Sequence, residues 1–425
     1  MDTTHLAADS LDPDFATNGV FTFSTQTYGR LTINRLVLTS DEKILVGLMR
    51  ADSVNITNFY CIGRLLNDGT PDPDFGNNGV VEGRFLGDAV SFGSSVVIRG
   101  DDRILLSGYL LPPSGEFVPR RPALVQYLDN GEIDHEFGED GFVYLDFPPP
   151  KSSDNIQNAP TTGPPDTYSE YFSFKTSSLP DGKILFSGVT ETDRYTYGTG
   201  FSVLGRLSAD GSLDESFGDK GWVYPKPPQN IVDQHLIQAD GKILLAGQKE
   251  DVPGHLGYVA RYFPDGALDS DFGSSGYAFF DGLNGGHVTA IAFHGIEQKL
   301  LVGANKRVDG EWSAVLLSFT NDGQRDADFN GGEPLSIKLG TSSFNLTLKN
   351  FVIDDDGVIL LGDMGNIALT RYLLNGTPDP MYADGRGWAE FSALESYDLA
   401  RQSDGKILFT GMRLSGEKFI ARFLE

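Results

Sequence analysis

An aspartate recurs through the chain three residues after the glycine of a short polar segment such as SADG or NDG. The series comprises Asp72, Asp134, Asp214, Asp269, Asp326 and Asp379, with Asp12 as its N-terminal counterpart. Around Asp214 the sequence reads LDESFGDKG, which holds several carboxylates, and calcium prefers oxygen ligands of this kind. Five units also carry an upstream arginine: Arg64, Arg206, Arg261, Arg371 and Arg422. Each aspartate is therefore either a calcium ligand or the partner of turn N–H groups and a nearby arginine. We favour the second role, because a residue repeated in every unit generally serves folding.

No other group of residues has the spacing of a catalytic or metal-binding motif. The six histidines form no HxH or HExxH pattern, and no G-x-S-x-G sequence is present. Two acidic pairs, Glu191 with Asp193 and Asp309 with Glu311, have the residue types of an acid and a base for polysaccharide cleavage, but their spacing is unspecific. The single cysteine, Cys61, lies in an apolar run and is expected to be a small buried side chain. We predict no catalytic residue, no metal site and no cofactor.

These residues belong to a tandem repeat that has two parts. The first part reads DGKILLAG at Asp240–Gly247, and the second, RLSADGSLDESFGDKG at Arg206–Gly221, follows the KIL segment of its own copy. The lysine of KIL or its equivalent marks seven copies: Lys43, Arg103, Lys183, Lys242, Lys299, Val358 and Lys406. Successive residues of a strand point to opposite faces, yet Ile243–Ala246 are all apolar. This pattern predicts a short strand that is buried on both faces.

The two ends of the chain complement each other. The chain stops halfway through a copy, at Phe419–Phe423, and begins with the missing half, at Leu11–Phe15. An open solenoid has atypical ends, whereas a ring closed by strands from both termini explains this split. We therefore predict an all-β fold, a seven-bladed β-propeller with four-stranded blades that occupies residues 1–425 as a single domain, closed by an N-terminal outer strand that joins the C-terminal strands. A connection rich in Pro, Ser and Thr, at 148–171, is predicted to be an insertion.

The unit DGKIL…R…DGxLDxxFGxxG resembles the delta-60 repeat, a bacterial tandem repeat that is expected to build seven-bladed propellers. The resemblance covers nearly the whole chain. It has departures: Tyr382 replaces the phenylalanine, Gln126 and Ser318 replace the arginine, and Val358 replaces the lysine. The resemblance implies no catalytic residue, cofactor or substrate.

The turns before KIL and before LDxxFG hardly change between copies, whereas the other connections differ in every copy. In a propeller these variable connections emerge together on one face, where binding residues usually lie. They are Arg50–Tyr60, Leu110–Arg121, Thr190–Gly200, Gln248–Leu256, Asn305–Trp312 and Arg413–Lys418. They carry basic and aromatic residues, a mixture found at binding hot spots. The predicted ligand-binding residues are Arg50, Tyr60, Arg120, Arg121, Arg194, Tyr195, Tyr197, Lys249, Arg307, Trp312 and Arg413.

The overall charge limits the classes of partner. With 59 acidic and 33 basic side chains the net charge is −26, and such a field repels nucleic acid and anionic membranes. No apolar run approaches the roughly 20 residues that cross a bilayer, and the N-terminus lacks the basic and apolar regions of a secretory signal. We expect a soluble monomer, without nucleic-acid partner or membrane insertion, that is cytoplasmic or exported by a signal-independent route. The predicted function is non-catalytic recognition of a protein or glycan ligand. The alternative is a polysaccharide-acting hydrolase or lyase with its site in the central funnel.

Overall fold

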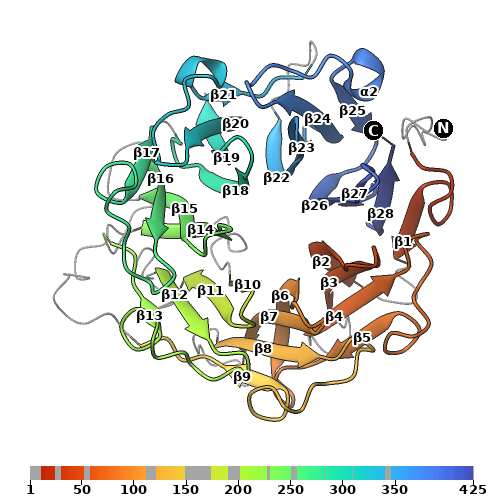
Figure 1. Ribbon diagram of the computed structural model, residues 1–425. Helices are drawn as coiled ribbons and strands as arrows, with labels where there is room; N and C mark the ends of the chain where they lie inside the picture. Colours follow the sequence, from red (N-terminus) through yellow and green to blue (C-terminus); the bar gives the residue numbers. More distant parts are fainter. Residues whose placement is uncertain are drawn as a thin grey trace.

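The computed structural model describes residues 11–23, 30–51, 58–111, 121–148, 174–189, 202–226, 230–249, 256–281, 283–308, 310–339 and 346–424. Their strands form seven four-stranded antiparallel sheets that surround a central axis (Figure 1). The prediction of a seven-bladed β-propeller is therefore confirmed. The insertion predicted at 148–171 lies, apart from its first residue, outside the described residues.

We number the blades along the chain and give the strands of each from the axis outward. Blade 1 consists of β2 (Arg30–Leu38), β3 (Ile44–Ala51), β4 (Asn58–Leu65) and β5 (Val80–Gly83). Blade 2 consists of β6 (Val90–Ile98), β7 (Ile104–Leu111), β8 (Arg121–Tyr127) and β9 (Phe142–Tyr144). Blade 3 consists of β10 (Lys175–Ser178), β11 (Ile184–Val189), β12 (Ser202–Leu207) and β13 (Trp222–Val223). Blade 4 consists of β14 (Asn230–Ile237), β15 (Ile243–Lys249), β16 (Leu256–Tyr262) and β17 (Tyr277–Phe280). Blade 5 consists of β18 (His287–His294), β19 (Lys299–Val308), β20 (Glu311–Thr320) and β21 (Leu335–Ser336). Blade 6 consists of β22 (Thr347–Ile353), β23 (Gly357–Asp363), β24 (Ile367–Leu373) and β25 (Trp388–Phe391). Blade 7 is β26 (Glu395–Arg401), β27 (Ile407–Met412), β28 (Lys418–Phe423) and β1 (Val20–Phe23). Two short helical turns, η3 (Asn330–Gly332) and α2 (Tyr382–Gly385), precede the outer strands β21 and β25.

The KIL segments form the second strand of each blade and are buried on both faces. In β15 the residues Ile243–Ala246 are at most 1% exposed. Leu244 and Ala246 belong to a core shared with blade 5, whereas Ile243 and Leu245 belong to a core shared with blade 3. The alternation of a strand thus sends successive apolar side chains into two different inter-blade cores. Burying each leucine or isoleucine contributes about 2 kcal/mol, so these layers are the main stabilisation of the ring.

The seventh sheet joins the two ends of the chain. Strand β1 pairs antiparallel with β28, and the register runs from Val20 opposite Ala421 to Phe23 opposite Lys418. Before β1, the backbone N–H of Asp12 donates to the carbonyl of Arg422 at 2.9 Å, and the N–H of Arg422 donates to the carbonyl of Gly19 at 3.0 Å. The N-terminal segment therefore supplies both the outer strand and the aspartate of blade 7.

The innermost strands of six blades contain a β-bulge, which turns polar side chains toward the next blade. The register of β2, β6, β14, β18, β22 and β26 against the second strand of each blade shifts by a residue or two. At the bulge of β2, Asn34 Nδ2 donates to the carbonyl of Gly93 in blade 2 at 2.6 Å. At the bulge of β14, Asp233 Oδ2 accepts from the N–H of Val288 in blade 5 at 3.0 Å. Bulged strands satisfy the backbone of the neighbouring blade around the axis.

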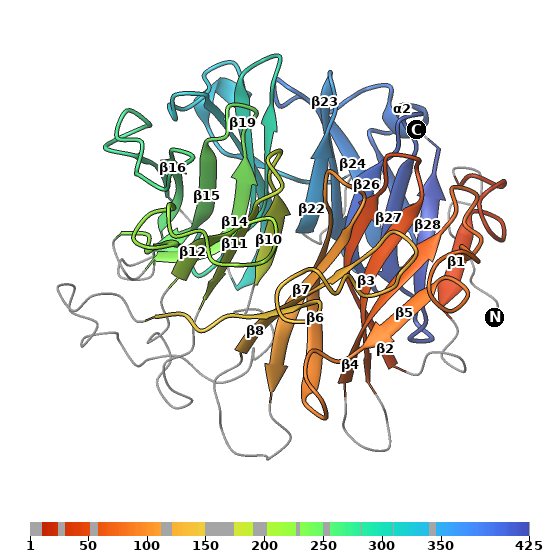
Figure 2. The ribbon, with the colours of Figure 1, turned by 60° about the horizontal axis from the view of Figure 1, so that its bottom comes forward.

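The two ends of the strands define two different faces of the ring. The turns between the first and second strands and between the third and fourth strands lie on one face, which we call the repeated face. The hairpins between the second and third strands lie on the other, the variable face, toward which β7 points in the side view (Figure 2). Within the part of the chain that the structure describes, no helix is long and apolar enough to span a membrane.

Candidate functional site

The repeated aspartate is the centre of a dense set of contacts within its own blade. In blade 3, Asp214 Oδ2 lies 2.7 Å from Arg206 Nε and 3.0 Å from Lys183 Nζ. Asp214 Oδ1 accepts from the N–H and the hydroxyl of Ser216 at 3.1 and 2.6 Å. The guanidinium carbon of Arg206 lies 4.7 Å from the ring centroid of Phe217, which is fully buried. Both oxygens of this carboxylate are therefore occupied by protein donors, and the lysine of KIL is one of them.

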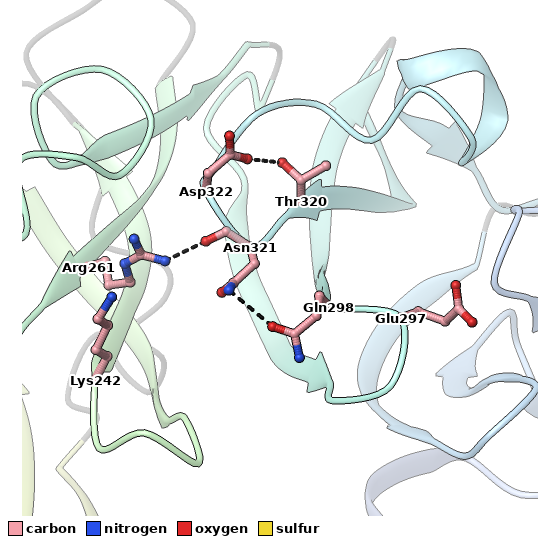
Figure 3. A pocket seen from close by; sticks show the side chains of 7 residues that line it. All are labelled: Lys242, Arg261, Glu297, Gln298, Thr320, Asn321 and Asp322. Carbon is pink, nitrogen blue, oxygen red and sulfur yellow. Dashed lines mark hydrogen bonds between the residues drawn. The ribbon is translucent and has the colours of Figure 1, made fainter.

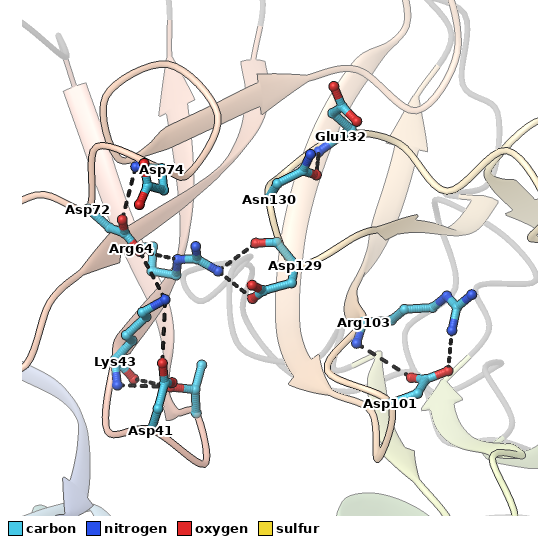
Figure 4. A network of polar contacts seen from close by, with 11 residues as sticks. Asp41, Lys43, Arg64, Asp72, Asp74, Asp101, Arg103, Asp129, Asn130 and Glu132 are labelled. Atoms are coloured by element: carbon cyan, nitrogen blue, oxygen red, sulfur yellow. Dashed lines mark hydrogen bonds and ion pairs between the residues drawn. The ribbon is translucent and has the colours of Figure 1, made fainter.

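The same arginine connects its blade to the next one. In blade 1, Arg64 donates through Nε to Asp72 Oδ2 at 2.8 Å and through Nη1 to the carbonyl and the carboxylate of Asp129 in blade 2, at 2.5 and 2.6 Å (Figure 4). Nearby, the N–H of Gly76 donates to the carbonyl of Asn130 at 2.9 Å. Gly76 has a φ of +52°, and an added Cβ would lie 2.5 Å from the carbonyl oxygen of Val80. The FG glycine is thus required for the hydrogen bond from Gly76 to Asn130. We call this bond, together with the bonds from the arginine Nη1 to the following blade, the inter-blade staple.

The staple recurs with equivalent acceptors around the ring. In the blades with the repeated arginine, its Nη1 donates to the second residue of the turn in the following blade: Arg206 to Pro264, Arg261 to Asn321 and Arg422 to Asn67. Arg371 differs, because it pairs mainly with Asp354 of its own blade, at 2.9 Å. Blade 6 faces blade 7, whose third strand, β28, ends at Phe423, one residue before the last described residue.

The blades that lack the arginine use other residues. In blade 2, Gln126 Nε2 donates to Asp134 Oδ2 at 2.8 Å, and Arg99 bonds Gln126 and reaches the carbonyl of Ala209 in blade 3 at 2.9 Å. The guanidinium of Arg99 also faces Phe137, at 5.9 Å. In blade 5, Ser318 Oγ donates to Asp326 Oδ2 at 2.9 Å, with Lys299 Nζ 3.1 Å from the same oxygen. The guanidinium of Arg99 thus makes the bond to blade 3 that the repeated arginine makes in other blades.

A shallow pocket of about 420 Å³ lies on the repeated face between blades 4 and 5 (Figure 3). Its lining comprises Lys242, Arg261, Glu297, Gln298, Thr320, Asn321 and Asp322. Arg261 donates to the carbonyl of Asn321, whose side chain donates to Gln298 Oε1 at 3.1 Å. Arg261 and Asn321, which join blades 4 and 5, thus also line the pocket. Among the residues that the structure describes, no three His, Cys, Asp or Glu side chains are arranged to hold a metal ion.

Four predicted site residues that the structure describes, Arg50, Arg121, Arg307 and Arg413, each lie beside an aromatic ring. The Arg50 guanidinium lies 4.8 Å from the Phe59 ring and forms an ion pair with Glu82. Arg121 makes two bonds to Asp146, at 2.9 and 2.8 Å, and lies 5.3 Å from the Tyr144 ring. Arg413 lies 5.9 Å from the Phe419 ring, and Lys249 is the last residue of β15. Four predicted residues lie outside the described residues: Arg120, Arg194, Tyr195 and Tyr197.

The expectation that Tyr60 is an exposed loop residue is wrong. Tyr60 lies in β4, is 1% exposed, and its hydroxyl accepts a hydrogen bond from Tyr127 at 2.9 Å. Its strand partner is Gly83, where an added Cβ would lie 2.4 Å from the Tyr60 hydroxyl. The missing side chain at Gly83 leaves the space that the tyrosine ring fills. Burial raises the pKa of Tyr60 well above its ordinary value, and Tyr127 adds to this, so the phenol stays protonated.

On the variable face, blade 5 brings an arginine, a tryptophan and a histidine together. The Arg307 guanidinium lies 4.9 Å from the Trp312 ring, and the His287 ring packs edge-on against the same indole with centroids 5.8 Å apart. Arg307 is exposed, whereas Trp312 and His287 are partly buried. These residues come from β18, β19 and β20, so a regular sheet holds them in place. We call Arg307, Trp312 and His287 the blade 5 platform.

The structure reveals a second polar cluster, between blades 6 and 7, that the sequence analysis missed. Lys349 Nζ lies 3.4 Å from Asp363 Oδ2 and 3.7 Å from Glu395 Oε1. Tyr397 donates to Glu395 Oε2 at 3.1 Å and accepts from Lys418 Nζ. Burial raises the pKa of Asp363, although Lys349 and Ser396 act in the opposite direction. Lys349 and Tyr397 lie at bulges of β22 and β26, and inner-strand bulges have no repeated sequence that would identify them.

A third group lies deeper, on the inner strands of blades 1, 3, 4 and 7. Burial lowers the pKa of Lys175 to about 7, and the positive charge of Arg35 contributes, whereas Asp233 and Asp398 oppose the shift. His235 lies between the hydroxyls of Ser177 and Ser187, at 2.8 and 2.7 Å. Burial, together with Lys175 and Arg35, lowers its pKa to about 3, so it is neutral at pH 7.

The lowered pKa of Lys175 predicts a pH-dependent contribution to stability. In the unfolded chain a lysine titrates near pH 10.4, so the charged form is disfavoured by folding, and this cost is present in full below about pH 7. The cost disappears as the pH rises from about 7 to about 10. Lys175→Met is therefore expected to raise the melting temperature at pH 6 by more than at pH 9.5. The control Lys338→Met removes an exposed lysine and should give equal, small changes at both pH values. An equal effect of Lys175→Met at both pH values would contradict the assignment.

Together, the closed ring, the inter-blade staples and the two unlike faces define a repeat-built seven-bladed β-propeller. The family model described as domain of unknown function (DUF5122) beta-propeller matches residues 179–217 and 238–272. Each matched segment runs from the turn before KIL to the phenylalanine of the FG motif, in blades 3 and 4. The match supports a propeller repeat family. No curated protein matches the chain.

Several solved structures are similar in fold. The β-propeller domain of the Trilobed protease from Pyrococcus furiosus has 10% sequence identity and a TM-score of 0.49, covering 93% of this chain and 94% of that one. Extracellular domains 1-2 of Drosophila Semaphorin 1b have 10% identity and a TM-score of 0.49, covering 98% and 88%. Prolyl oligopeptidase B from Galerina marginata has 10% identity and a TM-score of 0.44, covering 91% of this chain and 47% of that one. At these scores the similarities carry no argument about function.

Proposed function

We propose that this propeller is a non-catalytic recognition module whose variable face binds a protein or a glycan. The observation that carries the proposal is the different use of charged side chains on the two faces. On the repeated face, the arginine and the aspartate are buried and paired with each other, as with Arg206 and Asp214, and the half-buried Lys183 pairs with the same carboxylate. On the variable face the described charged residues differ from blade to blade, and Arg50, Arg121 and Arg307 are partly or fully exposed. A rigid scaffold that carries non-repeated residues at its loop ends is typical of binding proteins.

The arginine–aromatic pairs support this function in energetic terms. Arg307 and Trp312 lie on paired strands, and Arg121 and Tyr144 are held by adjacent strands of blade 2. Side chains that are already ordered lose little conformational entropy when a ligand binds. Indole and phenol rings offer a flat apolar surface, and guanidinium groups add hydrogen-bond donors. The delta-60 resemblance fits a repeat propeller of this kind, and we retain it as a proposal.

A combined substitution tests the assignment of the face. Arg121→Ala, Arg307→Ala and Trp312→Ala together are expected to abolish binding in a screen of glycans and of extracted proteins, because hot-spot arginine and tryptophan residues each contribute about 2 kcal/mol or more. The melting temperature should hardly change, since exposed ion pairs contribute about 0–1 kcal/mol. The control pair Ser208→Ala and Lys220→Ala alters a partly buried and an exposed position on the repeated face of blade 3 and should retain binding. Loss of binding in the control but not in the triple variant would reverse the assignment.

The cluster between blades 6 and 7 favours a second candidate, a polysaccharide-acting hydrolase or lyase with its site at the mouth of the funnel. Asp363 and Glu395 both lie within 4 Å of Lys349 Nζ, and Asp363 has a raised pKa while Glu395 is ion-paired. Two carboxyl groups with different environments are what acid and base catalysis of glycoside cleavage needs. Release of sugar fragments from a polysaccharide panel, abolished by Glu395→Gln, would establish this candidate. No release from any panel member would leave the recognition function as the better account.

A further inference from the structure

Arg307 of the blade 5 platform is held in place by the sheet but has no acidic partner. It lies opposite Trp312 across β19 and β20, and its guanidinium lies 4.9 Å from the centre of the indole ring. Counting only the described residues, no carboxylate pairs with this guanidinium and no acceptor bonds it. The side chain is exposed. Its N–H donors are therefore available to a ligand.

Other arginines at this end of the blades are neutralised by the fold. Three of them form an ion pair with a carboxylate of their own blade: Arg50 with Glu82, Arg84 with Asp88, and Arg121 with Asp146. The chain has 59 acidic and 33 basic side chains, so acids are not scarce. An exposed guanidinium that the fold leaves without one of them is suited to an external carboxylate.

The surroundings of Arg307 supply donors and few acceptors. The indole N–H of Trp312 also bonds no acceptor in the described part of the chain. The backbone carbonyl of Arg307 already accepts from Asn284 Nδ2, at 3.2 Å. Glu311 precedes Trp312 on β20 and lies opposite Val308, and successive strand residues point to opposite faces, so its carboxylate leaves the sheet on the other side. A ligand at this platform must therefore bring acceptors.

We propose that the blade 5 platform binds the carboxylate of a hexuronic acid residue in an acidic oligosaccharide. The two oxygens of a carboxylate match two parallel N–H groups of a guanidinium. The pyranose ring that carries the carboxylate then lies beside the indole of Trp312, whose ring offers an apolar surface. Its hydroxyls can accept from the indole N–H. The inference rests on the proposed recognition function and names the ligand class of that function.

An acidic sugar suits the platform better than an acidic peptide does. Arg307 and Trp312 offer donors only, and each peptide residue other than proline brings a further N–H donor that needs an acceptor. A sugar hydroxyl both donates and accepts, so it can adapt to a surface of donors. The net charge of −26 repels a long polyanion. The ligand is therefore a short oligosaccharide or the end of a chain.

Isothermal titration of the full chain with trisaccharides tests the proposal, in about 0.15 M salt to screen the net charge. The probes are the trisaccharides of galacturonate, glucuronate and mannuronate, their methyl esters, and an acetylated and amidated triglutamate peptide of the same charge. At least one hexuronate trisaccharide should bind wild type. Its methyl ester should bind about tenfold or more weakly, because the charged carboxylate is lost.

Substitutions assign this binding to the platform. Arg307→Met should weaken the affinity by about tenfold or more, and Arg307→Lys by less, because it keeps the charge but loses the paired donors. Trp312→Phe removes the indole N–H and should also weaken binding. The matched control is Arg325→Met in the same blade. The Arg325 guanidinium also lies 4.9 Å from an aromatic ring, that of Phe319, but on the repeated face, so the control should leave the affinity unchanged.

Four results would overturn the inference: no binding of any hexuronate by wild type, equal binding of a hexuronate and its methyl ester, wild-type affinity in Arg307→Met, or an equal loss in Arg325→Met. Tighter binding of the triglutamate peptide than of every hexuronate would also overturn it and identify a peptide ligand. The comparison with the methyl ester uses wild type alone, so it decides the question even if a variant fails to fold.

The proposed function is judged separately. A different ligand that binds wild type and is lost in the triple variant of Arg121, Arg307 and Trp312 would leave recognition by the variable face intact. Only the hexuronate assignment would then fail.

Discussion

Deletion of residues 1–24 is expected to lower the free energy of unfolding by several kcal/mol. The deletion removes β1, which pairs with β28, and leaves the edge of that strand without hydrogen-bond partners. It also removes Asp12, whose Oδ2 lies 2.9 Å from Arg422 and 3.2 Å from Lys406. The buried Arg422 would then lack its carboxylate, and a buried charge without a partner costs about 3–5 kcal/mol. Equilibrium unfolding in urea, followed by tryptophan fluorescence, measures this loss.

A milder variant separates the loss of the strand from the loss of the ion pair. Asp12→Asn keeps β1 and its hydrogen bonds but removes the carboxylate charge, so it should be destabilised by less than the deletion. Asp14→Asn changes an exposed neighbour and serves as the control, with an expected effect within about 0.5 kcal/mol. If the truncated chain unfolded at the urea concentration of wild type, β1 would not contribute to closing the ring.

Asp214→Ala is expected to destabilise the protein by about 3 kcal/mol, because it leaves Arg206 buried without its charge partner. The same variant removes the acceptor for the N–H of Ser216. Asp210→Ala changes an exposed aspartate four residues earlier and should cost about 1 kcal/mol at most, through its bonds to Ser212. EDTA should not shift the melting temperature of wild type. A rise of many degrees on addition of calcium chloride would instead indicate that the metal binds the native state.

The Asp214 carboxylate also makes stability depend on acid. Burial alone would raise its pKa, but the hydrogen bonds from Ser216 and the contacts with Lys183 and Arg206 outweigh burial and hold the pKa well below its ordinary value. The stabilisation is therefore complete above the ordinary aspartate pKa of about 3.9 and is lost as the pH falls below it. Asp214→Ala should show a weaker loss of stability than wild type between pH 5 and pH 2.

The architecture was predictable because each copy of the repeat carries the same buried strand and the same turn glycines. The four apolar residues Ile243–Ala246 indicate a strand buried on both faces, and the structure places them in two inter-blade cores. The aspartate–arginine pairing followed from its recurrence. The sequence did not predict that the KIL lysine is a second partner of the aspartate, because a lysine at the start of a strand is ordinarily solvent-exposed.

The residues that sequence reasoning missed depend on contacts between copies. Arg99 replaces the arginine absent at Gln126, but it directly follows the inner strand β6, where the repeat has no recurring charge. Lys349 and Tyr397 lie where inner strands bulge, and a bulge changes the face toward which a residue points. Tyr60 was misplaced because its burial depends on Gly83 of the neighbouring strand. The hydrophobic period and the composition of one strand do not show which residues of neighbouring strands it contacts.

The repeated aspartate and arginine are held to serve folding, by pairing with each other within each blade. A double-mutant cycle with Asp214→Ala, Arg206→Met and the double variant, followed by urea unfolding without calcium, measures the strength of this pairing. The two residues contact each other at 2.7 Å, so the account predicts a coupling free energy of about 2 kcal/mol or more, with the double variant more stable than the sum of the single losses implies. Losses that add to within about 0.5 kcal/mol would contradict the account, because residues without a direct interaction behave in that way.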